Sequence, residues 1–179
     1  METNVFRGIV SVLYLLILTS CSAIPLTSML KVATMNSDDI SAIQPSEIRV
    51  RLSVSEPVNL KTKDVRLVLS FEHNDNTKSE FQYLLKYIKQ NKVSSISSIF
   101  GSEPAKSVYH FKFSRKSELE FNRYQKSFLA KGKPKRYHWT VYYHFKTRPQ
   151  KGEKAEIDME LKLANDQEYF YLLKSATID

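Results

Sequence analysis

The chain has 179 residues, a formal net charge of +8 and one cysteine. The length is about that of one domain, and a lone cysteine excludes a framework of intramolecular disulfides. Four glycines are too few for repetitive or low-complexity sequence, whereas ten Phe and ten Tyr supply ample apolar surface for a core. The composition therefore indicates a single domain that is held together by hydrophobic packing.

The N-terminus has three parts that are typical of a secretory signal peptide. Residues 1–8 are polar with one basic side chain, Arg7, and residues 9–18 are almost wholly apolar. The small residues Thr19 and Ser20 follow. A membrane-spanning helix needs about 20 apolar residues, and this run is roughly half that length.

The last four residues of this segment, Leu18-Thr19-Ser20-Cys21, resemble the lipobox of bacterial lipoproteins. The resemblance covers residues 1 to about 22 and implies cleavage before Cys21, lipidation of its thiol and acylation of the new amine. Several acyl chains make a durable anchor, because each buried methylene contributes roughly 0.8 kcal/mol. Ser22, where an aspartate would imply inner-membrane retention, implies the periplasmic face of the outer membrane; the inner membrane and the cell surface stay open. An ordinary signal peptide with an incidental cysteine is the alternative.

We expect a signal peptide over 1–20, a lipid-anchored tether over 21–45 and a globular domain over 46–179. Glu2 and Arg7 cancel, so the chain from Cys21 onward also carries +8. Outside the cytoplasm this charge favours anionic lipid or acidic polymers over nucleic acid. A basic surface that is merely solvated is the alternative.

Strict alternation of apolar and polar residues predicts β-strands. It occurs over residues 47–54, 64–72, 107–113, 137–145 and 154–163. A further segment, 168–174, is apolar on both faces, so we expect it to be central in a sheet or covered on its second side.

Two longer segments have apolar residues at helical spacing. In the first, Thr77 and Glu80 form a possible capping box before a stripe at 81, 84, 85 and 88, and the helix ends near Lys92. In the second, Ser117 and Glu120 precede a stripe at 121, 124 and 128, and Gly132 is a plausible C′ residue. A short helical turn over 38–42, capped by Ser37, lies within the tether.

The order of elements is therefore ββαβαβββ. It predicts an α+β domain in which an antiparallel sheet is covered by two helices. A β-sandwich with helical insertions is the alternative fold.

The sequence contains no recognisable catalytic or metal-binding motif. There is no G-x-S-x-G, H-E-x-x-H, P-loop or dinucleotide fingerprint, and we expect no enzyme activity, catalytic residue, metal site or cofactor. His138 and His144 are roughly 20 Å apart along an extended strand and cannot share one ion, although His110 could approach one of them. A hydrolase without a visible motif is the remaining enzymatic alternative.

Charged residues gather in two places. Glu156, Asp158 and Glu160 share one face of a predicted strand, and we expect a solvated face, with His144 near Glu156 if residues 148–152 close a tight hairpin. The candidate contacts for an anionic ligand are basic, and they form either one patch or two basic ends of one sheet: Lys131, Lys133, Lys135, Arg136, Lys146 and Arg148.

We therefore expect a membrane-anchored envelope lipoprotein that acts by binding, as an accessory or structural component of an envelope assembly. A binder of anionic lipid or glycan is the alternative. An exposed apolar patch around Tyr169, Tyr171 and Leu173 would favour a protein partner, and convergence of the lysines at 131–136 with Lys146 and Arg148 would favour an anionic ligand.

Overall fold

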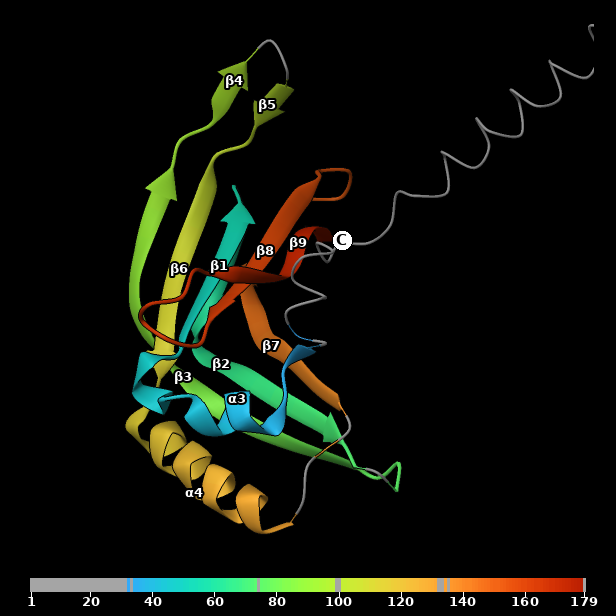
Figure 1. Cartoon of the computed structure of the whole chain (residues 1–179). Helices are drawn as coiled ribbons and strands as arrows, with labels where there is room; N and C mark the ends of the chain where they lie inside the picture. Colours follow the sequence, from blue (N-terminus) through green and yellow to red (C-terminus); the bar gives the residue numbers. More distant parts are fainter. Residues whose placement is uncertain are drawn as a thin grey trace, which may run out of the picture.

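The computed structural model describes residues 32, 34–73, 75–98, 101–131, 134 and 136–178, with the backbone alone at 98, 101–102 and 128–131. In chain order the elements are α3 (Ser37–Ala42), η1 (Pro45–Glu47), β1 (Arg49–Ser55), β2 (Asn59–Glu72), β3 (Lys78–Val93), β4 (Ile96–Ser98), β5 (Gly101–Glu103), β6 (Lys106–Phe113), α4 (Arg115–Lys131), β7 (Arg136–Thr147), β8 (Ala155–Lys162) and β9 (Phe170–Ile178). Figure 1 shows a strongly coiled sheet with α4 across one end and the β4–β5 ribbon projecting from the other. The predicted signal peptide and Cys21 lie outside the described residues.

Seven strands form one antiparallel sheet in the order β7-β2-β3-β6-β1-β8-β9. The strand β3 belongs to both arms of the sheet, because it pairs with β2 up to Leu84 and with β6 from Leu85 onward. It therefore turns the corner that makes the sheet nearly closed and barrel-like.

The predicted α+β fold, with two helices covering the sheet in the order ββαβαβββ, is wrong. The segment expected to be the first helix is the strand β3, and the sheet is a nearly closed layer with α4 at one end. The β-sandwich alternative is wrong as well, because the seven strands form one continuous sheet.

The apolar residues of β3 fit two periods, and the structure uses the period of two. Three residues of the helical stripe, Phe81, Leu84 and Ile88, are 37%, 42% and 45% exposed. The fourth member, Leu85, is buried at 4%, and so is Tyr83, two residues before it on the same strand face, at 1%. Pairing with β2 and then with β6 supplies backbone partners on both sides of the corner, and such tertiary context overrides a weak helical preference.

The predicted capping box at Thr77 belongs to the β2–β3 hairpin. The Thr77 backbone N–H and hydroxyl both donate to Asp75 Oδ1, at 3.0 and 2.7 Å. Asn76 has a φ of 63°, in the left-handed region that Asn tolerates. The turn chemistry of these residues therefore closes a hairpin rather than starting a helix.

The other alternating segments are strands as predicted. β1, β6, β7 and β8 fall on them, and β2 on the segment at 64–72, which it extends back to Asn59. The segment at 168–174 leads into β9, which is an edge strand with both faces half covered rather than a central one.

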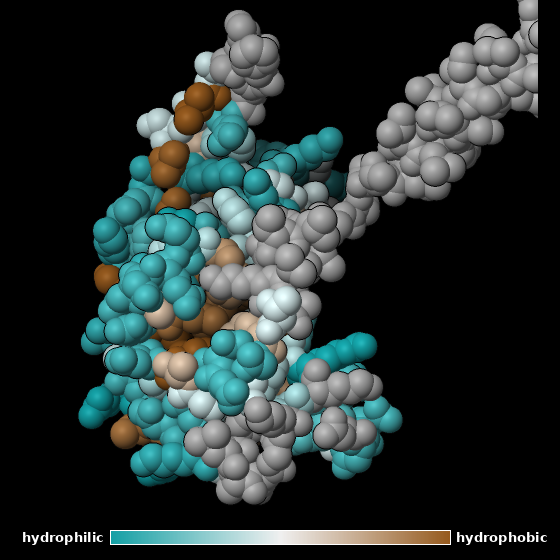
Figure 2. Space-filling view, in the orientation of Figure 1, coloured by the Kyte–Doolittle hydropathy of each residue, from teal (hydrophilic) through white to brown (hydrophobic). Residues whose placement is uncertain are grey.

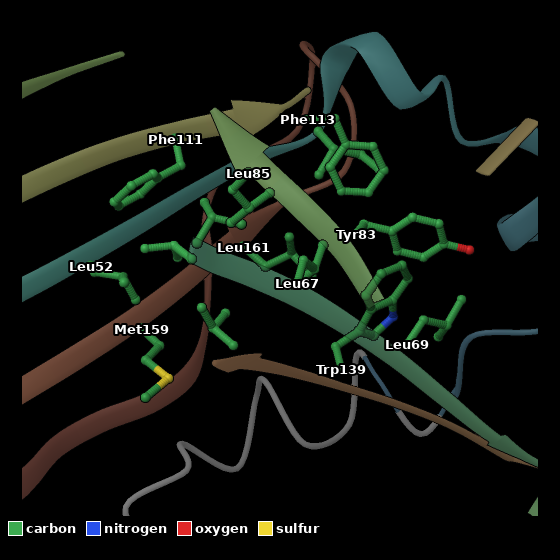
Figure 3. Close-up of a cluster of buried hydrophobic side chains, with 14 of the residues drawn as sticks. Leu52, Leu67, Leu69, Tyr83, Leu85, Phe111, Phe113, Trp139, Met159 and Leu161 are labelled. Atoms are coloured by element: carbon green, nitrogen blue, oxygen red, sulfur yellow. The ribbon is translucent and has the colours of Figure 1, made fainter. Parts of the chain in front are cut away.

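Inward side chains from both arms of the sheet meet in one core. Figure 3 shows residues from the β6-β1-β8 arm facing residues from the β2–β7 arm, among them Leu52, Phe111, Met159, Leu161, Leu67, Leu69 and Trp139. Burying one such side chain fully stabilises the fold by roughly 1.5–3 kcal/mol. The alternation read from the sequence is therefore the main determinant of the sheet.

The second predicted helix is confirmed as α4, and it closes one end of the core. Phe121 is fully buried, with its ring 5.3 Å from that of Tyr83 and 6.4 Å from that of Trp139. The helix begins three residues earlier than the predicted cap at Ser117 implies. Ser114 Oγ accepts from the Ser117 backbone N–H at 3.2 Å, while Ser117 Oγ donates to the Leu84 carbonyl at 2.8 Å. Gly132 lies outside the described residues.

The short helix α3 packs against α4. Asn36, rather than Ser37, caps it by accepting from the backbone N–H groups of Asp38 and Asp39. The buried side chain of Gln125 donates to the carbonyls of Ile40 and Ile43, both at 2.8 Å. The end of the segment expected as a tether thus contributes Ile40 and Ile43 to the core.

Candidate functional site

A cleft of about 960 Å³ opens where β2 and β3 separate. The two strands pair only between 66–72 on β2 and 78–84 on β3. Residues 59–65 of β2 therefore have β7 alone as a neighbouring strand, and residues 85–93 of β3 have β6 alone. The described residues that line this β2–β3 cleft are Asn59, Leu60, Lys61, Thr62, Lys63, Asp64, Tyr87, Gln90, Tyr109, His144, Lys146 and Thr147.

Irregularities on both strands explain why they diverge here. The β2–β7 register shifts between Lys61 and Arg66, and within that step Asp64 has a φ of 63°. The β3–β6 register shifts between Tyr87 and Lys89. Such bulges bend a strand and increase its twist, so they separate the two strands at the point where the cleft lies.

The floor of the cleft is fixed by hydrogen bonds around Tyr109, which is 2% exposed. Its hydroxyl donates to Asn59 Oδ1 at 3.3 Å and accepts from the Leu60 backbone N–H at 3.4 Å. Asn59 Nδ2 in turn donates to Thr147 Oγ1 at 3.2 Å. These hydrogen bonds connect the start of β2 and the end of β7 to Tyr109 on β6. The floor of the cleft is therefore preorganised.

The rim of the cleft is cationic. Lys61, Lys63 and Lys146 are exposed, and none of them takes part in the salt bridges found among the described residues. His144 stands directly opposite Lys61 in the β2–β7 register, so both side chains lie on one face. Asp64 is the single carboxylate among the described lining residues.

A smaller hollow of about 350 Å³ adjoins the cleft and shares Asp64 and His144 with it. Arg66 and Gln82 line it, with Arg66 Nη1 donating to Gln82 Oε1 at 3.0 Å. Tyr142, 54% exposed, completes the lining. Cleft and hollow together present lysine ammonium groups next to tyrosine rings, a combination that suits an anionic ligand with an apolar or ring-shaped part.

The structure separates the basic residues that the sequence singled out. Arg136 begins β7 and Lys146 lies near its end, roughly 33 Å away along an extended strand. Arg148 follows β7, with its guanidinium 5.8 Å from the centre of the Phe145 ring. Lys133 and Lys135 lie outside the described residues, and of Lys131 only the backbone is described. Lys146 is the candidate that lines the cleft, and contact of these residues with an anion stays a prediction.

Sequence reasoning missed Lys61 and Lys63. Both belong to a polar run that precedes the predicted strand over residues 64–72. The structure extends β2 through this run as far back as Asn59. The signal was present in the spacing, because two lysines at i and i+2 on a strand share one face.

The acidic row on β8 is not the solvated face that we expected. Asp158 and Glu160 are 8% and 6% exposed. Lys106 Nζ lies 3.0 Å from Asp158 Oδ2, and Arg51 binds Glu160. The predicted proximity of His144 and Glu156 is also wrong, because β7 and β8 are not neighbours in the sheet.

The described residues contain no group of three or more His, Cys, Asp or Glu side chains that is placed to hold a metal ion. His110 lies on β6, whereas His138 and His144 lie on β7, and the two strands β3 and β2 lie between β6 and β7 in the sheet. Burial, together with Lys89 and Arg51, holds the pKa of His110 below its ordinary value. Tyr169, Tyr171 and Leu173 are each half-buried, so they form no large exposed apolar patch.

Comparison with protein-family models, with curated proteins and with solved structures finds no match to this chain. Within the described part of the chain, every helix is too short or too polar to cross a bilayer.

Proposed function

We propose that this chain is a membrane-anchored lipoprotein whose folded domain acts by binding, and that the β2–β3 cleft takes an anionic glycan. The observation that carries the proposal is the cleft itself: three exposed lysines without a salt-bridge partner surround a preorganised floor that includes tyrosine rings. Lysine ammonium groups are compact charges that suit sulfate, phosphate or carboxylate groups. The anchor rests on the lipobox-like segment at Leu18–Cys21.

The open shape of the site supports an extended ligand. The cleft continues into the hollow at Tyr142 through the shared residues Asp64 and His144. A chain of sugar rings would lie along this path with its anionic substituents at Lys61 and Lys146. Such a role is that of an accessory component of a cell-envelope assembly rather than of an enzyme.

The anchor is tested by expressing the chain in a Gram-negative host and weighing its N-terminal peptide by mass spectrometry. A triacylated peptide that begins at Cys21, absent from a Cys21→Ala variant, is the expected result. An unmodified N-terminus in the wild-type chain would overturn the anchor and the localisation with it.

The cleft is tested by calorimetric titration of the full chain with a heparin oligosaccharide, beside a neutral maltodextrin of the same length. We expect binding of the anionic probe alone, and a loss of roughly tenfold or more in the Lys61→Gln/Lys63→Gln/Lys146→Gln variant. The matched control is Lys78→Gln/Lys126→Gln/Lys154→Gln, which removes the same charge from exposed lysines that do not line the cleft. Equal losses in both variants would show a nonspecific charge effect and overturn the cleft as the site.

A second observation favours a protein partner at a different place. The β4–β5 ribbon projects from the sheet, and Val93 and Ile96 at its base are 46% and 58% exposed. Figure 2 shows hydrophobic atoms gathered over this ribbon in the upper left. Exposed apolar side chains on a projecting ribbon are typical of protein interaction surfaces.

The partner is tested by a photo-crosslinking amino acid placed at Ile96 in living cells, with the same residue at Lys151 as the control. A discrete adduct from position 96 and none from position 151 would support a partner on the ribbon. Absence of an adduct from position 96, or equal adducts from both positions, would overturn it.

A further inference from the structure

Four cations lie in one transverse row on the outer face of the sheet. In the strand registers Lys86 stands opposite Lys112, Lys112 opposite Arg49, and Arg49 opposite Lys162. Directly opposite residues of an antiparallel pair point to the same face, and neighbouring strands are about 4.8 Å apart. The row therefore crosses β3, β6, β1 and β8 in roughly 14 Å.

The cation row has no salt-bridge partner in the described part of the chain. None of the salt bridges found there includes any of its four members. The carboxylates two residues before Arg49 and Lys162 bind other groups: Glu47 Oε2 accepts from the Asn165 backbone N–H at 3.0 Å, and Glu160 binds Arg51.

Contacts within the chain position two side chains of the row. Arg49 Nη1 donates to the Ser46 carbonyl at 2.6 Å and to the Ile48 carbonyl at 2.9 Å. Lys162 Nζ lies over the Tyr169 ring, 5.9 Å from its centre, in a cation–π contact. Two of the cations are thus positioned by contacts that leave their charge without an acidic partner.

Like charges directly opposite one another destabilise a sheet. The row contains three such pairs, so we expect it to lower stability when no anion is bound. The nearest similar row shows the contrast, because there Arg51 stands opposite Glu160 and is neutralised. The two rows lie on the same face, and among the described residues only the second one has a counter-charge within the chain.

We propose that the cation row is a docking surface for anionic phospholipid headgroups, which holds the folded domain against the membrane. Charge complementarity selects the partner: a repeating row of cations on an outer sheet face fits a surface of headgroup phosphates better than it fits one small ion. Basic residues near an anionic bilayer each strengthen binding, and their effect is screened by salt. The proposal rests on the membrane anchoring proposed above for its location, and on the cation row for its chemistry.

The test is vesicle flotation of the full chain carrying Cys21→Ala, which removes the acylation site. Phosphatidylcholine vesicles are compared with vesicles that also contain phosphatidylglycerol, at low and high salt. The row variant is Lys86→Gln/Lys112→Gln/Lys162→Gln. The matched control is Lys78→Gln/Lys126→Gln/Lys154→Gln, which removes the same charge from exposed lysines that belong neither to the row nor to the cleft. Because all variants carry the same apolar N-terminal run, its contribution cancels between them.

We expect the row variant to bind phosphatidylglycerol vesicles roughly a hundredfold more weakly, while the control variant and binding to neutral vesicles change little. Equal losses in both variants, or no loss in the row variant, would overturn the proposal. So would a row variant that loses binding to soluble polyphosphate but keeps its binding to vesicles, since the row would then serve a free anion.

The two proposals fail separately. An unlipidated N-terminus with row-dependent vesicle binding would remove the anchor and leave the docking surface. A lipidated N-terminus with an unaffected row variant would remove the docking surface alone.

Discussion

Arg51 on β1 donates two hydrogen bonds to Glu160 on β8, from Nε to Oε2 at 2.6 Å and from Nη2 to Oε1 at 2.5 Å. The guanidinium also lies 4.2 Å from the centre of the Tyr169 ring. These bonds to Glu160 raise the pKa of Arg51 above its ordinary value, against the opposing effect of burial. The Glu160 side chain is only 8% exposed, so its charge is tolerable because Arg51 is present.

Removing either partner is expected to destabilise the fold by different amounts. Arg51→Gln leaves a buried carboxylate without its cation, and we expect a loss of about 2–3 kcal/mol in the free energy of unfolding. Glu160→Gln leaves an arginine that is 32% exposed and partly solvated, so the loss is smaller, about 1 kcal/mol. Urea unfolding measures both. The control is Lys92→Gln, which removes an exposed pair with Glu56 and should change little. A larger loss for Glu160→Gln than for Arg51→Gln would contradict this account.

Tyr83 places a hydroxyl in the core without a hydrogen-bond partner among the described residues, although the residue is only 1% exposed. An unpaired buried hydroxyl lowers stability. We expect Tyr83→Phe to leave the free energy of unfolding unchanged or to raise it by about 1 kcal/mol at neutral pH, measured by urea unfolding. The comparison is Tyr109→Phe, which removes a hydroxyl that bonds Asn59 and Leu60 and should destabilise the protein. A loss in Tyr83→Phe as large as that in Tyr109→Phe would show that the hydroxyl is satisfied.

Buried tyrosines make the fold sensitive to alkaline pH. Burial raises the pKa of Tyr137 from 10.0 to about 12, and burial also raises the pKa of Tyr83. Because the folded-state pKa is the higher one, the unfolded chain loses its phenolic protons first as the pH rises past 10. Stability is therefore complete below pH 10 and falls progressively as the pH rises toward 12. Urea unfolding at a series of pH values checks this, and Tyr137→Phe should flatten the decline. A wild-type stability that stays level across this interval would refute the prediction.

The sequence predicts the strands correctly where the apolar residues fit only one period. In β1 and β6 every second residue is apolar and no helical stripe competes, so Leu52 and Phe111 could be assigned to the core. In β3 the apolar residues satisfy both periods, and the choice depends on the β2 and β6 backbones that lie beside it. A single chain segment holds no information about those neighbours, so the helix over 77–92 was the natural and wrong interpretation.

The candidate site was less accessible to sequence reasoning because it is made by an irregularity. The cleft exists because the β2–β3 pairing ends at Arg66 and Leu84. No residue type in the sequence predicts where two strands stop pairing. Alternation also identifies the outward face of β8 without saying whether another element covers it. Glu160 is outward-facing and yet buried, because Arg51 and Tyr169 lie over that face.

Gln125 is expected to hold the N-terminal end of the fold in place. Its side-chain amide donates to the Ile40 and Ile43 carbonyls from within a buried contact between α4 and α3. Gln125→Ala leaves these carbonyls unpaired, and we expect a loss of about 1–3 kcal/mol. Hydrogen exchange should rise first at residues 37–43, before the sheet exchanges. Uniform acceleration over the whole domain would mean that α3 is not a separately anchored unit.

A substitution in the cation row is expected to stabilise the fold, whereas most core substitutions destabilise it. Lys112 stands between Lys86 and Arg49 in the strand registers, so replacing it by a neutral residue relieves two like-charge contacts. We expect Lys112→Gln to raise the free energy of unfolding by about 0.5–1 kcal/mol at low ionic strength. The gain should shrink in high salt, because screening already weakens the repulsion in the wild-type chain.

Lys146→Gln is the control for this gain, because Lys146 has no cross-strand partner in the described β2–β7 register and carries the same charge. It should change stability little at either ionic strength. Equal stabilisation by the two substitutions would point to the net charge of +8 as the cause instead of the row. A gain confined to Lys112→Gln, together with weaker binding to anionic vesicles, would mean that the chain keeps a destabilising arrangement of charge because its partner is the membrane surface.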